Sequence, residues 1–552
     1  MMKNLRRTFA STLICLLALT ALPAPVAAQD GEPTYDIVIR HGRVLDGAGN
    51  PWIAADVAIK EGRFVRIGKI AGRGKREIDA TGKYVSPGWI DMLDQSGSVL
   101  PKNGLAESKL LMGITTGIAG EAGTPVLAEK LAEYFSELEK SGISMNFGTY
   151  YSETQARVAV LGEVSREPTA GELERMKALV EIAMKNGALG ITTALIYPPA
   201  SYSKTDELVE MAKVAGRYGG IYATHIRGEG KELVTSIEEA ITIGEKGRLP
   251  VEIYHLKAAY QPGWGKLMRA AGETIEQARM RGVDVAADMY LYTAGGTALA
   301  AVVPSWAFEG GNEKLIERLK DPSLRARLKK EITTGSPGWW NIVEAAGGWD
   351  NIVLAGAENK DNVRFEGKSL AKIAKELNKE PADAAFDLIV QGDGGRVSAL
   401  YFMMGDQDII TALKFPWTSL GSDASASLKF VADGNDSDPG HPRSYGNFPR
   451  LITRYVREQK VLTLEEAIRK MTSWPATRMR LASRGLIKEG CWADVVIFDY
   501  DKIQDRATYE RPRLTPAGID FVLVNGQVVV ENGKHTGARP GKVIYGPGRQ
   551  IQ

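Results

Sequence analysis

The chain has very little cysteine, with 2 Cys among 552 residues. Cys15 lies in an N-terminal segment that we expect to be removed, so Cys491 would remain alone. An internal disulfide is then excluded, even for a protein in an oxidising compartment. We expect Cys491 to be an inert packing residue.

An excess of charge of one sign is also missing. Lys and Arg number 69 against 67 Asp and Glu, which gives a formal net charge of +2. Hydrophobic residues make up 44% and charged residues 25%, as in soluble globular proteins. No basic excess is available to attract nucleic acid or an anionic membrane. We therefore expect neither a nucleic acid nor a membrane as partner, and the oligomeric state stays open.

A long apolar run occurs at the N-terminus. Lys3, Arg6 and Arg7 precede an unbroken apolar stretch at 12–19, and small residues fill 23–28. This pattern predicts a secretory signal peptide over residues 1–28, too short to span a membrane. Its loss removes three positive charges and turns the net charge of +2 into −1. We expect an exported protein, either periplasmic or secreted.

The remaining chain divides into three parts by pattern. Residues 29–83 and 484–552 contain short strand-like runs separated by Gly-containing turns, which predicts one small composite β-sandwich-like domain. Between them, residues 84–483 alternate strand-like and helical runs, which indicates a parallel sheet covered by helices. The strand-like runs are 84–93, 113–121, 143–151, 190–198, 220–226, 250–256, 285–292 and 417–425. Eight such runs close a TIM (β/α)8 barrel.

One connection in this barrel is too long. A single crossover helix needs far less chain than lies between the last two runs, and its first part, about 298–365, is helical and charged. We interpret it as an insertion over the barrel mouth that forms a lid or a substrate wall. A solvated excursion with no role in the site is an equal alternative.

Two of the 5 histidines end successive strand-like runs. His225 closes GGIYATH and His255 closes LPVEIYH. The carboxyl ends of barrel strands meet at one rim, where sites are built. A lone His at such a place is most often hydrogen-bonded and structural, but two in register indicate a metal site.

Further polar residues follow the other strand-like runs. They are Glu121, Arg227, Glu229, Lys257, Asp288, Tyr290, Tyr292 and Asp423. Two imidazoles and a carboxylate can hold a divalent ion and leave one position open for water. A second carboxylate must then move the proton, and Asp423 is the candidate. On local sequence alone, Asp423 could equally cap a helix or form an Asx turn.

The motifs VSPGWID, THIRGEG, HLKAA, DMYLYTAGGT, GSDAS and HPRSYGNFPR together resemble the D-aminoacylases of the amidohydrolase superfamily. The resemblance covers the chain from about Tyr35 onwards. It implies a metal-bearing TIM barrel with a small composite β domain. It also implies that His225 and His255 bind the metal and that Asp423 is the general acid and base. Arg443 and Lys257 would hold the substrate carboxylate, assisted by Tyr290 or Tyr292.

The chain departs from this family at two places. The family's first strand carries a His-x-His pair, where this chain has Leu93 and Gln95. Strand 2 of the family offers a Cys, where this chain has Ala122 preceded by Glu121. Glu121 can substitute only if the strand end bends, because neighbouring residues on a strand point to opposite sides. We therefore predict one zinc ion, held by Glu121, His225 and His255.

These residues predict a metal-dependent hydrolase that acts through metal-activated water. The resemblance implies that its substrates are N-acyl-D-amino acids or small D-residue-containing peptides. A dipeptidase or a cyclic-amide hydrolase on the same barrel is the alternative within hydrolases. The alternative from another class is a catalytically silent binding protein with a decayed metal site.

Overall fold

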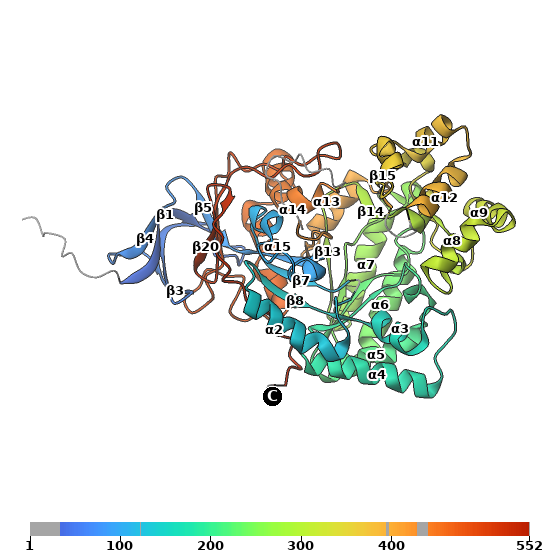
Figure 1. The fold of residues 1–552 in the computed structure, drawn as a ribbon. Helices are drawn as coiled ribbons and strands as arrows, with labels where there is room; N and C mark the ends of the chain where they lie inside the picture. The colour runs from blue at the N-terminus through green and yellow to red at the C-terminus, as the bar shows by residue number, and fades with distance from the viewer. Residues whose placement is uncertain (1–33, 122, 393–396, 428–439, 551–552) are drawn as a thin grey trace, which may run out of the picture.

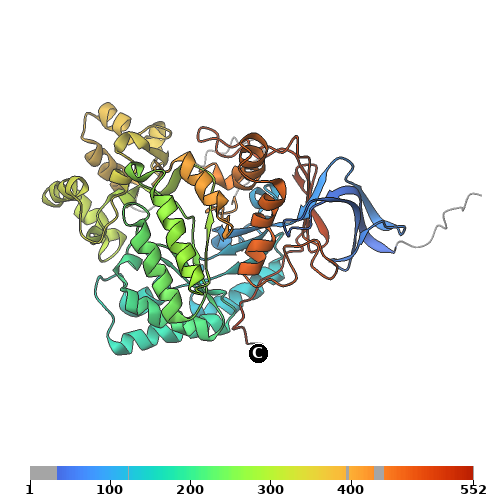
Figure 2. The same ribbon diagram turned by 180° about the vertical axis from the view of Figure 1, so that it is seen from behind.

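The computed structural model describes residues 34–121, 123–392, 397–427 and 440–550. The predicted signal peptide, 1–28, lies outside the described residues. The described chain forms a central barrel with a β-sheet at one end and an inserted helical unit at the opposite end (Figure 1). The view from behind shows the same arrangement (Figure 2).

The barrel is built from parallel strands that are buried on both faces, as expected for strands covered by helices. They are β6 (Trp89–Asp94), β7 (Ile114–Ala119), β8 (Asn146–Thr149), β9 (Tyr151–Ser152), β10 (Gly190–Ala194), β11 (Ile221–His225), β12 (Val251–Ile253), β13 (Val285–Met289) and β17 (Thr418–Leu420). β8 continues directly into β9 and joins the two sheets. A parallel bridge between Asp94 and Ala424 closes the ring between β6 and β17. The predicted eight-stranded barrel is confirmed.

Helices follow the strands along the chain. They are α1 (Glu107–Leu111), α2 (Leu131–Ser141), α3 (Glu153–Leu161), α4 (Ala170–Lys185), α5 (Thr205–Arg217), α6 (Leu233–Gly247), α7 (Leu267–Met280), α13 (Asp406–Lys414), α14 (Arg443–Arg450), α15 (Leu464–Met471) and α16 (Ser473–Arg478). A π-helical segment, Leu451–Glu458, continues α14. Capping follows the sequence: Thr169 and Glu172 form a reciprocal capping box at the start of α4.

The two ends of the chain form one nine-stranded sheet. Its strands are β1 (Tyr35–Val44), β2 (Ile53–Lys60), β3 (Arg63–Gly68), β4 (Gly74–Asp79), β5 (Tyr84–Pro87), β18 (Val495–Phe498), β19 (Ile519–Val524), β20 (Gln527–Glu531) and β21 (Lys534–His535). The N-terminal and C-terminal halves meet where β5 pairs antiparallel with β18. Cys491 is buried in the core of this sheet.

The first predicted run, 84–93, is divided between the two units. Its first half is β5 in the composite sheet, and its second half is β6 in the barrel. Gly88 stands between them, where a Cβ atom would lie 2.2 Å from Oγ1 of Thr115. Only glycine lets the chain pass from one unit to the other at this point.

The C-terminal tail returns to the barrel. The backbone N–H of Phe147 donates to the carbonyl of Lys542 over 3.0 Å, and Ile544 N–H donates to Phe147 over 2.7 Å. The N–H of Gly546 donates to Gly187 in the same way. The predicted composite segment 484–552 therefore ends in a stretch that packs on the barrel.

The insertion is longer than the predicted 298–365 and is not purely helical. It contains β14 (Ala294–Ala298), α8 (Asn312–Lys320), α9 (Pro322–Thr334), α10 (Ile342–Ala345), β15 (Ile352–Gly356), α11 (Leu370–Leu377), α12 (Pro381–Gln391) and β16 (Ser398–Phe402). The strands form a small antiparallel sheet in the order β14-β16-β15. The pairing of β14 with β16 joins segments about a hundred residues apart, which local sequence patterns cannot reveal.

Within the described residues, no helix combines the length and the apolar composition needed to cross a membrane.

Candidate metal centre

Three side chains meet at the carboxyl ends of β7, β11 and β12. Nδ1 of His225 lies 2.7 Å from Oε1 of Glu121, and Nε2 of His255 lies 3.1 Å from the same oxygen. The two imidazole nitrogens are 3.1 Å apart. All three residues are buried, and one ligand atom from each lies within 4.8 Å of the others.

Glu121 reaches this point because the end of β7 bends. The strand stops at Ala119, and the flanking Gly120 and Gly123 have φ values of +122° and +98°. A Cβ atom at Gly120 would lie 2.7 Å from the carbonyl oxygen of Tyr150. Glu121 was expected to substitute only if the strand end bends, and this bend is present. Ala122 lies outside the described residues.

The far nitrogens of both imidazoles face a second carboxylate. Oε1 of Glu229 lies 3.4 Å from Nε2 of His225 and 3.2 Å from Nδ1 of His255. A carboxylate behind a ligating histidine orients its ring and raises its basicity. Glu229 was expected at this rim from the sequence but was given no role there. The signal was its place four residues after His225, because each predicted ligand needs such a partner.

The buried carboxylates of the site favour a bound cation. Burial by itself would raise the pKa of Glu121, but hydrogen bonds from His225 and His255 outweigh it and hold that pKa well below its usual value. Burial lowers the pKa of His225, but the carboxylates of Glu229 and Glu121 outweigh burial and raise it to about 9. Two buried carboxylates thus attract positive charge into this pocket.

Leu93 and Gln95 occupy the rim beside these residues in different ways. Leu93 is fully buried in an apolar cluster. The side-chain amide of Gln95 donates to Oε2 of Glu121 and lies 3.5 Å from Oδ1 of Asp423. The amide therefore spans the space between the two carboxylates.

Asp423 follows β17 and faces the same pocket. Its backbone has a φ of +48°, and its N–H donates to the carbonyl of Leu93 over 2.9 Å. His255 also has a positive φ, of +35°. Left-handed backbone at non-glycine residues costs energy and occurs often at functional sites. Two residues of the predicted site share this feature.

Arg443, at the start of α14, pairs with Asp423. Nη1 of Arg443 lies 2.7 Å from Oδ2 of Asp423, and the guanidinium stacks on the ring of Tyr290, 4.7 Å from its centroid. Nε of Arg443 is buried and has no hydrogen-bond partner among the described residues. The backbone N–H of Arg443 donates to Nδ1 of His441, whose Nε2 donates to the carbonyl of Ala294. His441, which sequence reasoning did not select, thus ties α14 to the insertion.

The other two predicted substrate-binding residues are placed differently. Nζ of Lys257 pairs with Glu229 and lies 2.8 Å from Nδ1 of His255, so its charge is already balanced behind a predicted ligand. The ring of Tyr292 lies under the guanidinium of Arg450, 4.5 Å from it, and does not line the pocket of Asp423. Of the two tyrosines, Tyr290 is the one that borders this pocket.

The insertion forms part of the pocket wall. Residues 295–297 of β14, together with Trp340, Ile342, Tyr401 and Met403, line the pocket with His225, His255, Asp423 and Arg443. The hydroxyl of Tyr197, at the end of β10, donates to Thr297 over 3.0 Å. The pocket has a volume of only 30 Å³. These contacts favour the substrate-wall interpretation of the insertion over a solvated excursion.

Known proteins are similar to this chain over nearly its whole length. The model of the amidohydrolase family matches residues 431–530. D-aminoacylase of Alcaligenes xylosoxydans xylosoxydans is 30% identical over 545 residues, covering 94% of this chain and 99% of that protein. N-acyl-D-glutamate deacylase of the same organism is 31% identical and covers 93% of this chain and 97% of that protein.

Two solved structures share the fold over nearly the full length. N-acyl-D-glutamate deacylase from Bordetella bronchiseptica, complexed with zinc and a phosphonate mimic of the tetrahedral intermediate, is 29% identical with a TM-score of 0.77. It covers 93% of this chain and 100% of that one. A D-aminoacylase structure concerned with a binuclear metal centre, one-metal activation and second-metal attenuation is 30% identical with a TM-score of 0.76. The match covers 92% of this chain and 99% of that one.

Proposed function

Because this chain belongs to the D-aminoacylase branch of the amidohydrolase family and so hydrolyses carbon–nitrogen amide bonds, we propose that it uses one zinc ion to deacylate N-acyl-D-amino acids or small D-residue-containing peptides. The observation that carries the proposal is the convergence of Glu121, His225 and His255 in the pocket that also contains Asp423 and Arg443. The D-configuration of the substrate is supported by the names of both relatives.

The donor set fits a divalent ion such as zinc. Two imidazole nitrogens and a carboxylate oxygen are ligands of catalytic zinc sites, which keep one position open. The carboxylate of Glu229 behind both imidazoles fits the same assignment. A divalent ion bound there lowers the pKa of a bound water and polarises the substrate carbonyl.

The Gln95 amide supports one ion instead of two. A second ion would have to lie near Glu121 and Asp423, where the amide already bridges the two carboxylates. Leu93 has no ligand atom and is buried in the core. This arrangement favours a mononuclear centre, although one structural relative is described as binuclear.

The side chains divide the remaining work. Arg443 holds the free carboxylate of the substrate, because a guanidinium can bind a carboxylate through two charge-assisted hydrogen bonds. That carboxylate competes with Asp423 for Arg443, so substrate binding frees Asp423. Asp423 then takes a proton from the attacking water and returns it to the leaving nitrogen. Tyr290 fixes the guanidinium by stacking on it.

Metal analysis and one substitution test this assignment. We expect the purified protein to hold close to one equivalent of zinc and to lose activity with a chelator. Asp423→Asn should lower kcat by about 10²–10⁴-fold, because the proton carrier is lost, while zinc content stays unchanged.

Asp406→Asn is the matched control, since Asp406 pairs with Arg454 at the surface of α13. Normal turnover by Asp423→Asn, or full activity of the chelated protein, would contradict the mechanism. A protein that binds no zinc at all would favour the silent binding protein.

A further inference from the structure

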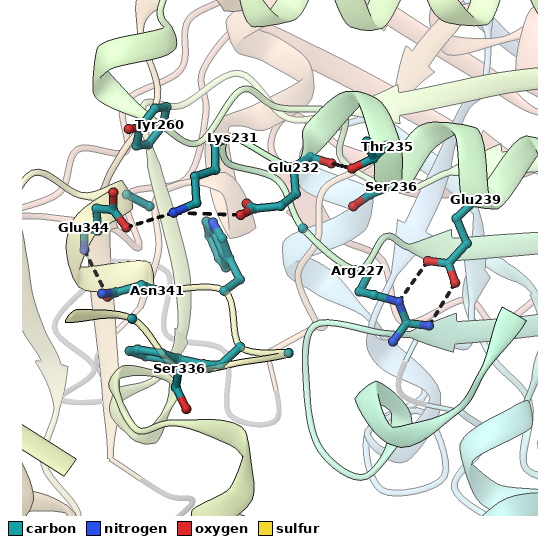
Figure 3. Close-up of a pocket in the computed structure, with 16 residues that line it drawn as sticks. Arg227, Lys231, Glu232, Thr235, Ser236, Glu239, Tyr260, Ser336, Asn341 and Glu344 are labelled. Carbon is teal, nitrogen blue, oxygen red and sulfur yellow. Dashed lines mark hydrogen bonds and ion pairs between the residues drawn. The ribbon is translucent and has the colours of Figure 1, made fainter. Parts of the chain in front are cut away.

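We propose that a second cavity, beside the metal pocket, binds the acyl half of the substrate and makes short peptidyl groups the preferred acyl groups. This inference rests on the proposed deacylase function and names its substrate class. The cavity has a volume of 530 Å³, and Figure 3 shows its lining. One wall is the start of α6 with the loop before it, and the other is the segment 335–345 of the insertion.

Trp340 is the common wall of the two spaces. It lines both the large cavity and the metal pocket. The loop after β11 also faces both: His225 and Glu229 border the metal pocket, whereas Arg227 and Lys231 border the cavity. A Cβ atom at Gly230 would lie 2.5 Å from Nε1 of Trp340, so the indole packs directly against this loop. An acyl group that extends from the metal pocket around Trp340 would reach the cavity.

The sizes of the two spaces indicate a long acyl group. The metal pocket, of 30 Å³, is too small to hold a whole acylamino acid. The cavity, of 530 Å³, lies in the range of sites that bind whole small ligands. An acetyl group would leave it empty, whereas an acyl group of about two residues extends into it.

The lining favours a peptide over an alkyl chain. Lys231 lies 4.0 Å from Glu232 and 3.6 Å from Glu344, so these charges pair only loosely and can rearrange around peptide N–H and C=O groups (Figure 3). The indoles of Trp339 and Trp340 line the same cavity and supply flat apolar faces. An alkyl chain would strip water from the charged groups without replacing their hydrogen bonds.

The tryptophan wall is held in place at both ends. Oγ of Ser336 donates to Glu331 in α9 over 2.8 Å. Asn341 accepts from the N–H groups of Val343 and Glu344 at the start of α10, and its amide donates to the carbonyl of Ile332 over 2.7 Å. The wall is therefore preformed, which limits the ordering cost of binding.

The test compares three acyl groups on the same residue with the zinc-loaded full chain. The substrates are N-acetyl-D-leucine, glycylglycyl-D-leucine and N-decanoyl-D-leucine, and the set is repeated with D-alanine and D-glutamate. We expect kcat/KM for the glycylglycyl substrates to exceed that of both others by about tenfold or more. Equal or higher values for the acetyl or decanoyl substrates would overturn the inference. Hydrolysis of none of the three would overturn the proposed deacylase function itself.

A pair of tryptophan variants locates the effect. Trp339 lines the cavity but not the metal pocket, so Trp339→Ala should reduce the glycylglycyl-to-acetyl ratio of kcat/KM at least fivefold. Trp52, which is 43% exposed and directly precedes β2, provides the matched control, and Trp52→Ala should leave the ratio unchanged. An unchanged ratio in Trp339→Ala would count against the cavity as the acyl site.

Discussion

At the scale of single residues, the site depends on a change of one position. The resemblance implies a thiolate ligand at position 122, whereas here the carboxylate of Glu121 lies beside the two imidazoles. Gly120 makes this possible because its φ of +122° is closed to residues with a Cβ atom. Glu121 can therefore reach the two histidines only while position 120 is glycine.

Gly120→Ala tests whether the position of Glu121 depends on this glycine. We expect it to lower zinc content and kcat together, because the new Cβ would lie 2.7 Å from the carbonyl of Tyr150 and push Glu121 away from the histidines. The measurements are zinc per chain by elemental analysis and the thermal midpoint.

Gly82→Ala is the control for backbone strain alone. Gly82 has a φ of +77° but open space around its Cβ position. It should cost about 1 kcal/mol of stability and keep its zinc. Full zinc content in Gly120→Ala would show that Glu121 is not held by this bend.

At the scale of elements, a buried lysine joins the last strand of the barrel to the first. Nζ of Lys109, on α1, lies 2.9 Å from Asp91 and 2.8 Å from Asp94 on β6. It also donates to Oγ of Ser422 over 2.7 Å and to the carbonyl of Ala424. These two residues flank Asp423. The seam that closes the barrel thus also sets the position of Asp423, the proposed proton carrier.

We expect Lys109→Met to destabilise the fold by about 3–5 kcal/mol, because two buried carboxylates lose their cation. The double variant Lys109→Met/Asp91→Asn should recover part of that loss, measured by denaturant unfolding. Lys130→Met, which breaks an exposed pair with Glu133, should change stability by less than about 1 kcal/mol. A loss in Lys109→Met no larger than in Lys130→Met would contradict this role.

At the scale of the whole molecule, the sheet built from the two chain ends lies at one end of the barrel, and the insertion lies at the opposite end (Figure 1). The composite sheet joins residues from both termini at β5 and β18, and the tail after Gly541 returns to the barrel. The insertion supplies walls of the candidate metal pocket and of the cavity proposed to bind the acyl group. The insertion that lines the two pockets and the sheet that pairs the two chain ends therefore lie at opposite ends of the molecule.

Export is the remaining prediction at this scale. We propose that residues 1–28 direct the chain out of the cytoplasm and are then removed, since a short apolar run follows three positive charges. Intact mass measurement of the exported protein should show a chain that begins near Gln29. Leu16→Arg should leave the uncleaved chain in the cytoplasmic fraction. Full-length protein in the cytoplasm of the unmodified strain would contradict export.

The sequence by itself determined the barrel, the composite sheet and the histidine pair. These follow from local periodicity and from the rule that parallel strand ends share one rim, so His225 and His255 could be placed without a structure. Tertiary structure alone decided which partner each polar side chain takes. Lys257 binds Glu229 instead of facing open space, Gln95 bridges Glu121 and Asp423, and β14 finds β16 across the insertion. Such pairings join distant segments, and their energies depend on burial that no local pattern contains.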